Sequence, residues 1–92
     1  MKKLAVTLVG LAAIQLSGCG VNSVTECTTE PQSSWLDQQK FQDGLKAQGY
    51  DIAEFKVTAG NCYEIYGHNN EGKKVEIYFN PVSGAVVKQE LK

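Results

Sequence analysis

The chain has 92 residues and a formal net charge of −1, from 9 basic and 10 acidic side chains. This length allows one small domain, and every basic residue is a lysine. Nucleic acids, phosphate groups and anionic lipids are bound by clustered cations, for which arginine is preferred. We therefore expect none of these classes among the partners.

Residues 1–18 have the features of a secretory signal peptide. Lys2 and Lys3 supply the positive charge, and residues 4–16 form an apolar stretch that is short for a bilayer span. An N-terminal transmembrane anchor is the alternative. The sequence Leu-Ser-Gly-Cys that ends at Cys19 resembles a bacterial lipobox. We therefore expect cleavage before Cys19 and attachment of lipid to it.

The lipid predicts a location in the bacterial cell envelope, because acyl chains hold a protein stably on a membrane. Gly20, rather than an acidic residue, follows Cys19, which favours the outer membrane, with the domain facing the periplasm. Loss of residues 1–18 removes two lysines and leaves a net charge of −3.

Residues 19–32 have the polar composition of a tether. If Cys19 carries lipid, Cys27 and Cys62 remain, and an oxidising compartment favours a disulfide between them. Closing this loop of about 36 residues would stabilise the fold by about 4 kcal/mol in the chain-entropy model. Two free thiols are the alternative.

The domain itself is expected over residues 33–92, beginning with a helix at 34–48. Ser33 or Ser34 is the predicted N-cap, and Gly49 is in the right place to end the helix at C′. Four strands follow, predicted at 50–58, 62–66, 75–80 and 85–88. The short turns between them make neighbours antiparallel.

One amphipathic helix laid across this four-stranded meander is a two-layer α+β domain. Its expected core combines apolar residues of both layers: Trp35, Leu36, Phe41, Leu45, Tyr50, Ile52, Phe55, Val57, Tyr63, Ile65, Val75, Ile77, Phe79 and Val87.

The hairpin at residues 60–80 also allows a predicted register. We place Gly72 in its turn at positive φ, because glycine adopts that conformation without steric cost. The resulting cross-strand pairs are Ile65 with Ile77 and Tyr63 with Phe79 on one face, and Tyr66 with Glu76 and Glu64 with Tyr78 on the other.

The second of these faces is the candidate partner-binding surface, formed by Glu64, Tyr66, Glu76 and Tyr78. Tyrosine supplies rigid contact area at protein interfaces. The alternative is that the two tyrosines pair across the strands and only stabilise the sheet.

No catalytic residue, cofactor or metal site is expected. His68 is the one histidine and lies in a predicted turn, whereas a zinc site needs three or four convergent ligands. Nucleophilic catalysis needs a serine or cysteine beside a base, and Cys62 is expected to be bridged. Glu64 and Glu76 could act as an acid–base pair, but exposed carboxylates on a sheet are far commoner.

Motifs between Gln48 and Gly84 give the domain a resemblance to the PepSY family. The resemblance rests on a helix that ends in Gln-Gly-Tyr, on residues 60–67 (GNCYEIYG) and on residues 72–81 (GKKVEIYFNP). It covers about residues 34–89 and implies a helix followed by strands. It also implies a small secreted or membrane-attached module, similar to one in propeptides of thermolysin-like metalloproteases. That module is thought to inhibit or chaperone the peptidase, and the family has no agreed catalytic residues.

We therefore expect a non-enzymatic lipoprotein, monomeric and without a cofactor, whose PepSY-like module faces the periplasm or cell surface. Its expected partners are the membrane, through the lipid, and a peptidase or peptide that it binds or inhibits. The alternative is a structural or envelope-stress accessory lipoprotein that acts as a tethered spacer.

Overall fold

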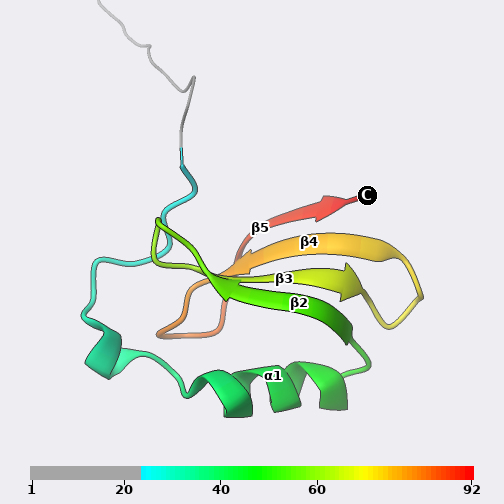
Figure 1. The fold of residues 1–92 in the computed structure, drawn as a ribbon, viewed down its shortest axis with the longest axis horizontal. Helices are drawn as coiled ribbons and strands as arrows, with labels where there is room; N and C mark the ends of the chain where they lie inside the picture. Colours follow the sequence, from blue (N-terminus) through cyan, green and yellow to red (C-terminus); the bar gives the residue numbers. More distant parts are fainter. Residues whose placement is uncertain (1–23) are drawn as a thin grey trace, which may run out of the picture.

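The computed structural model describes residues 24–92, so the expected signal peptide and the expected lipid site at Cys19 lie outside the described residues. Four antiparallel strands form one sheet in the order β2-β3-β4-β5, with one α-helix packed beside it (Figure 1). The elements are the 3-10 helix η2 (Gln32–Ser34), α1 (Gln38–Ala47), β2 (Asp51–Val57), β3 (Tyr63–His68), β4 (Lys74–Phe79) and β5 (Val86–Leu91). The predicted α+β class is confirmed. No helix within residues 24–92 has the length and hydropathy needed to cross a bilayer.

The helix begins later than predicted, because its N-cap is Asp37 and not Ser33 or Ser34. The Asp37 carboxylate accepts a hydrogen bond from the backbone amide of Lys40 at 2.9 Å. The end of the helix is as predicted, since Gly49 follows it with a φ of 100°.

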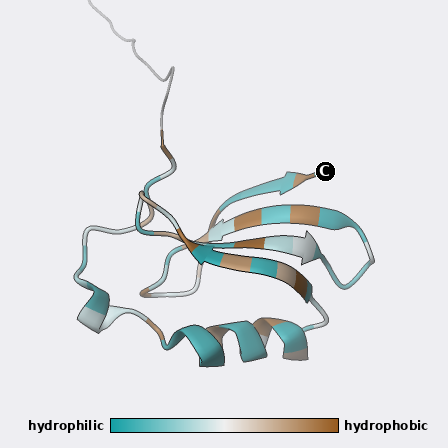
Figure 2. Cartoon of the chain, in the orientation of Figure 1, coloured by the Kyte–Doolittle hydropathy of each residue, from teal (hydrophilic) through white to brown (hydrophobic). Residues whose placement is uncertain are grey.

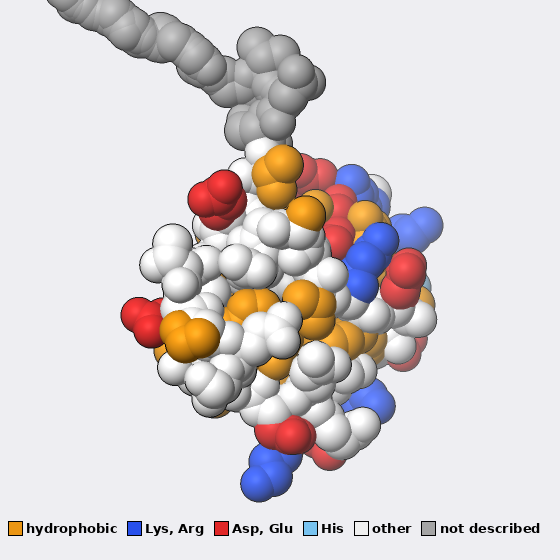
Figure 3. Space-filling view, turned by 60° about the vertical axis from the view of Figure 1, so that its left-hand side comes forward, with side chains coloured by type: hydrophobic (Ala, Val, Ile, Leu, Met, Phe, Trp, Pro, Cys, Tyr) orange, Lys and Arg blue, Asp and Glu red, His pale blue; other side chains and the backbone are white. Residues whose placement is uncertain are grey.

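Trp35 and Leu36, between η2 and α1, are extended rather than helical. Leu36 donates its backbone amide to the carbonyl of Pro81 at 2.7 Å, so a distant turn satisfies it. The predicted burial of Leu36 is wrong, since its side chain is exposed. Figure 3 brings the left-hand side of Figure 1 forward and shows several hydrophobic side chains at that surface.

The central hairpin has the predicted register, with all four predicted pairs present between β3 and β4. Its turn is held by Asn69, whose side-chain oxygen accepts the backbone amides of Glu71 and Lys73, each at 2.9 Å. Gly72 has a φ of 80°, as its predicted place in the turn requires. Alternating apolar and polar bands along β4 reflect its two different faces (Figure 2).

Both outer strands depart from the simple alternation. A bulge between Ile52 and Glu54 interrupts β2, and another irregularity lies where β4 meets the start of β5. The predicted burial of Val57 and Val87 is wrong, since both are exposed on the edge strands β2 and β5.

The core lies between α1 and the inner face of the sheet. Its buried members are Leu45, Tyr63, Ile65, Val75, Ile77 and Phe79. Phe41 joins the two layers, because its ring lies 5.1 Å from that of Tyr63 and 5.0 Å from that of Phe79. Aromatic contacts of this kind add to the stabilisation from apolar burial.

The predicted disulfide between Cys27 and Cys62 is present. It joins the segment before α1 to the start of the central hairpin, and Cys27 also donates its backbone amide to the carbonyl of Gly60 at 3.0 Å. Gly60 permits this approach, since a Cβ there would lie 1.9 Å from the carbonyl oxygen of Thr25. From residue 24 onward the expected tether thus lies against the domain.

Candidate functional site

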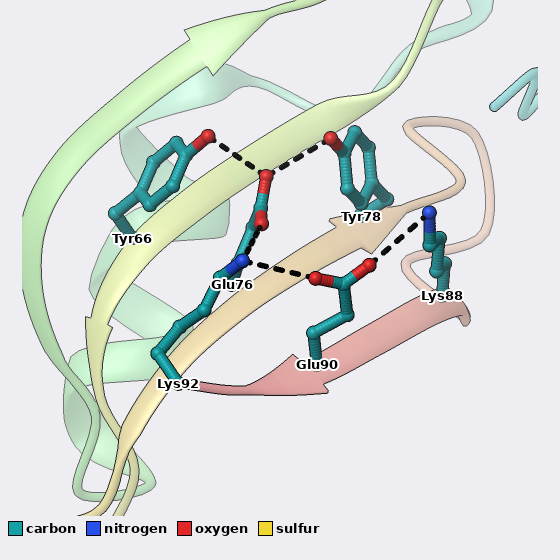
Figure 4. A network of polar contacts seen from close by, with 6 residues as sticks. All are labelled: Tyr66, Glu76, Tyr78, Lys88, Glu90 and Lys92. Atoms are coloured by element: carbon teal, nitrogen blue, oxygen red, sulfur yellow. Dashed lines mark hydrogen bonds and ion pairs between the residues drawn. The ribbon is translucent and has the colours of Figure 1, made fainter. Parts of the chain in front are cut away.

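The four residues of the predicted binding surface lie together on the outer face of β3 and β4. We call this cluster of Glu64, Tyr66, Glu76 and Tyr78 the tyrosine face. Its centre is Glu76, whose Oε2 accepts hydrogen bonds from the hydroxyls of Tyr66 at 2.7 Å and Tyr78 at 3.0 Å (Figure 4). Its Oε1 lies 2.9 Å from the ammonium of Lys92.

This environment stabilises the charged form of Glu76. A hydrogen bond with Glu64, followed by those with Lys92 and Tyr66, lowers the pKa of Glu76 to about 2. Its side chain is nearly buried, so water contributes little to this stabilisation. Glu76 is therefore a fixed anion bound by donors from the same chain.

Glu64 is the opposite case. Its side chain is 4 % exposed, and its Oε2 has no hydrogen-bond partner within the part of the chain that the structure describes. Burial, and next the hydrogen bond with Glu76, raise the pKa of Glu64. The pKa values of the two neighbouring carboxyl groups are thus shifted in opposite directions, and Glu64 holds its proton to a higher pH than Glu76 does.

The tyrosines of this face stay neutral. Burial and the bond to Glu76 raise the pKa of Tyr78 to about 12, and the bond to Glu76 also raises the pKa of Tyr66. Lysines from the flanking strands lie over the rings, with Lys56 Nζ 5.5 Å from the centroid of Tyr66 and Lys88 Nζ 5.7 Å from that of Tyr78. The two tyrosine hydroxyls and the Glu76 carboxylate are thus engaged with one another, whereas Glu64 Oε2 is not engaged within the described residues.

A second candidate site was not anticipated from the sequence. It is a groove of about 330 Å³ on the inner side of the sheet, which we call the α1–β5 groove. Its lining comes from α1, β4, β5 and the turns beside them: Lys40, Phe41, Gly44, Leu45, Gln48, Tyr50, Phe79, Gly84 and Val86.

The groove exists partly because of Gly44. A Cβ built on this helical residue would have no heavy atom within 4 Å, so the helix surface is open at that point. Phe41, Leu45 and Phe79 supply apolar lining, and Lys40 is the charged residue among those that line it. Such a groove fits an apolar side chain that is next to a carboxylate. The one sequence signal was a glycine inside a predicted helix, where it costs up to about 1 kcal/mol relative to alanine.

The remaining reactive residues lie elsewhere. His68 Nδ1 is 4.0 Å from Asp51 Oδ2 at an exposed end of the sheet, and Cys62 is buried in its disulfide. Among residues 24–92, no group of three or more histidine, cysteine or acidic side chains is placed to hold a metal ion.

A family model described as peptidase propeptide and YPEB domain matches residues 4–90. Neither the curated proteins nor the solved structures give a match.

Proposed function

Because the chain belongs to the PepSY family of peptidase propeptide and YPEB domains, we propose that it is a non-enzymatic module that binds a polypeptide. The α1–β5 groove takes an apolar side chain of the partner, with an acidic group of the partner beside Lys40. The partner is a peptidase, and binding restrains it.

The observation that carries this proposal is the open groove beside an edge strand. Its aromatic and aliphatic lining is a surface that binding would remove from water, and apolar burial is the main favourable term in association. The tyrosine face offers less, because its hydroxyls are already bound to Glu76 and Glu64 is buried.

We further propose that the module is held at the envelope by lipid on Cys19, at the outer membrane and facing the periplasm. The intact mass of the membrane-extracted protein tests this anchor. An acylated chain beginning at Cys19 is expected, and an unacylated chain beginning elsewhere contradicts it.

Site-directed photocrosslinking in the intact envelope tests the groove. A photoreactive residue replaces Gln48 in the groove and, as the control, Glu54 on the outer face of β2. We expect a specific adduct from position 48, identifiable as a peptidase by mass spectrometry. No adduct above that of position 54 contradicts the proposal and leaves a tethered spacer as the function.

A matched pair of substitutions sharpens the test. Gly44→Leu fills the open space in the groove, whereas Gly44→Ala adds one methyl group where nothing lies within 4 Å. The adduct should be lost with Gly44→Leu and kept with Gly44→Ala. Equal adduct in both variants contradicts binding in the groove.

A further inference from the structure

β5 is an edge strand: it pairs with β4 on one side, and no strand among the described residues pairs with its other side. Lys92 donates its backbone amide to the carbonyl of Lys74 at 2.9 Å, which fixes the alternation of the ladder with β4. Gln89 and Leu91 therefore direct their backbone amides and carbonyls toward the open edge. An edge with free groups of this kind accepts another strand.

Apolar side chains accompany these free backbone groups. Leu91 pairs with the buried Val75 and so lies on the inner side of the sheet, yet it is 62 % exposed. Val87 is 45 % exposed. The helix gives them no cover, because α1 packs against β2 at the opposite edge of the sheet (Figure 1).

The sequence of β5 around Gln89 is complementary to itself in the antiparallel direction. Reading outward from Gln89, Lys88 on one side corresponds to Glu90 on the other, and Val87 corresponds to Leu91. We propose that two copies of this chain pair their β5 strands about a two-fold axis at Gln89 and form one continuous antiparallel sheet.

In this arrangement both faces of the new strand pair are complementary. On the outer face, Lys88 of each copy lies opposite Glu90 of the other copy. On the inner face, Val87 of each copy lies opposite Leu91 of the other, so the exposed apolar side chains cover one another. Such a two-fold interface closes on itself and stops at a dimer.

The two neighbouring registers are disfavoured by charge. The register between the two strands can shift only in steps of two residues, because a step of one would turn each side chain to the other face of the sheet. One shift places Lys88 opposite Lys88 of the second copy, and the opposite shift places Glu90 opposite Glu90. Like charges directly opposite each other destabilise a strand pair.

The charges at this edge already pair along the strand within one copy. Lys88 Nζ lies 3.3 Å from Glu90 Oε2, and Lys92 Nζ lies 3.0 Å from Glu90 Oε1 (Figure 4). These side chains remain 40–48 % exposed and can reach a second partner. Charged side chains on an edge strand prevent unspecific pairing, which leaves the self-complementary partner as the favoured one.

Cysteine crosslinking of the full chain in its own membrane tests the dimer. Gln89→Cys places two cysteines opposite each other at the two-fold axis, at about 5.5 Å between Cα atoms, within disulfide range. Leu91→Cys and the unsubstituted chain are the controls, because two copies of residue 91 are too far apart to bridge. We expect roughly fivefold more covalent dimer with Gln89→Cys than with Leu91→Cys. Equal crosslinking of the two variants overturns the proposal.

Charge reversal tests the register. In the Gln89→Cys chain, Lys88→Glu places a carboxylate opposite Glu90, and the covalent dimer should fall roughly fivefold. Adding Glu90→Lys restores the opposite-charge pairs and should recover the dimer. If Lys88→Glu changes nothing, or if the doubly reversed chain stays monomeric while its circular dichroism matches the parent, the proposal is wrong.

Discussion

The outer and inner faces of the central hairpin differ in how far their side chains already have partners within the chain. On the outer face, Glu76 binds Tyr66, Tyr78 and Lys92, so donors of the same chain satisfy this carboxylate and both hydroxyls. On the inner face, α1 covers the core but leaves an apolar groove beside Gly44. Exposed aromatic residues alone therefore do not identify a binding surface. The difference lies in whether their polar groups and apolar area already have partners.

Removing the disulfide should have the largest effect, because both faces share β3, which starts directly after Cys62. Replacing Cys27 and Cys62 with alanine should lower the free energy of unfolding by about 4 kcal/mol in the chain-entropy model. Urea denaturation of the domain measures this loss. Reduction of the unsubstituted protein should give a similar loss, and a loss below about 1 kcal/mol in both would contradict the role given to the disulfide.

Two carboxamide substitutions should separate the carboxylates of the outer face. Glu76→Gln removes the anion that binds two hydroxyls and an ammonium, and should lower the free energy of unfolding by about 2 kcal/mol. Glu64→Gln should cost less than about 0.5 kcal/mol, because its amide can donate to Glu76 as the protonated carboxyl does. Denaturation at neutral pH compares the two variants, and the reverse order would refute the assigned protonation states.

The same pair predicts an unusual pH dependence of stability. Glu76 has a lowered pKa, so its contribution grows as the pH rises from about 2 to the unfolded value of 4.5. Glu64 has a raised pKa, so its contribution is complete below 4.5 and is lost as the pH rises through the folded value. Glu90, with a lowered pKa, acts in the same direction as Glu76.

Stability should therefore be greatest near pH 4.5 and decline above it. Urea denaturation over a series of pH values measures the profile. Glu64→Gln should remove the decline at higher pH, and Glu76→Gln should weaken the rise at lower pH. An unchanged profile in both variants is incompatible with the opposite pKa shifts of Glu64 and Glu76.

The smallest expected changes in stability come from two glycines, Gly44 on the open side of α1 and Gly72 in the hairpin turn as its control. A Cβ at either Gly44 or Gly72 meets no atom within 4 Å, but only Gly72 has a positive φ, of 80°. Gly44→Ala should raise the free energy of unfolding by about 0.5–1 kcal/mol, because alanine favours the helix. Gly72→Ala should lower it by a similar amount, about 1 kcal/mol. Thermal unfolding compares them, and destabilisation by Gly44→Ala would mean that the groove is filled.

Local signals made the central hairpin predictable. Alternation and the glycine of the turn specified the register, so the pairing of Tyr66 with Glu76 was found from the sequence. The disulfide was predictable from the cysteine count and the expected oxidising compartment. These features depend on neighbours along the chain or on a single pair of residues.

Features that depend on distant contacts were missed. Trp35 and Leu36 fit a helical pattern, but the carbonyl of Pro81 holds Leu36 in an extended segment. Val57 pairs with the buried Tyr63 and so lies on the inner face, but it is exposed because it ends the edge strand β2. The groove depends on where α1 lies across the sheet, which the periodicity of one helix does not determine.

We propose that the partner binds the inner face of the domain and not the tyrosine face. The most direct test is the affinity of the peptidase captured at position 48 for three forms of the protein. Gly44→Leu should weaken binding about tenfold relative to the unsubstituted chain, and Tyr66→Phe with Tyr78→Phe should change it less than about twofold. If the double phenylalanine variant loses binding while Gly44→Leu retains it, the binding site is the tyrosine face and not the α1–β5 groove.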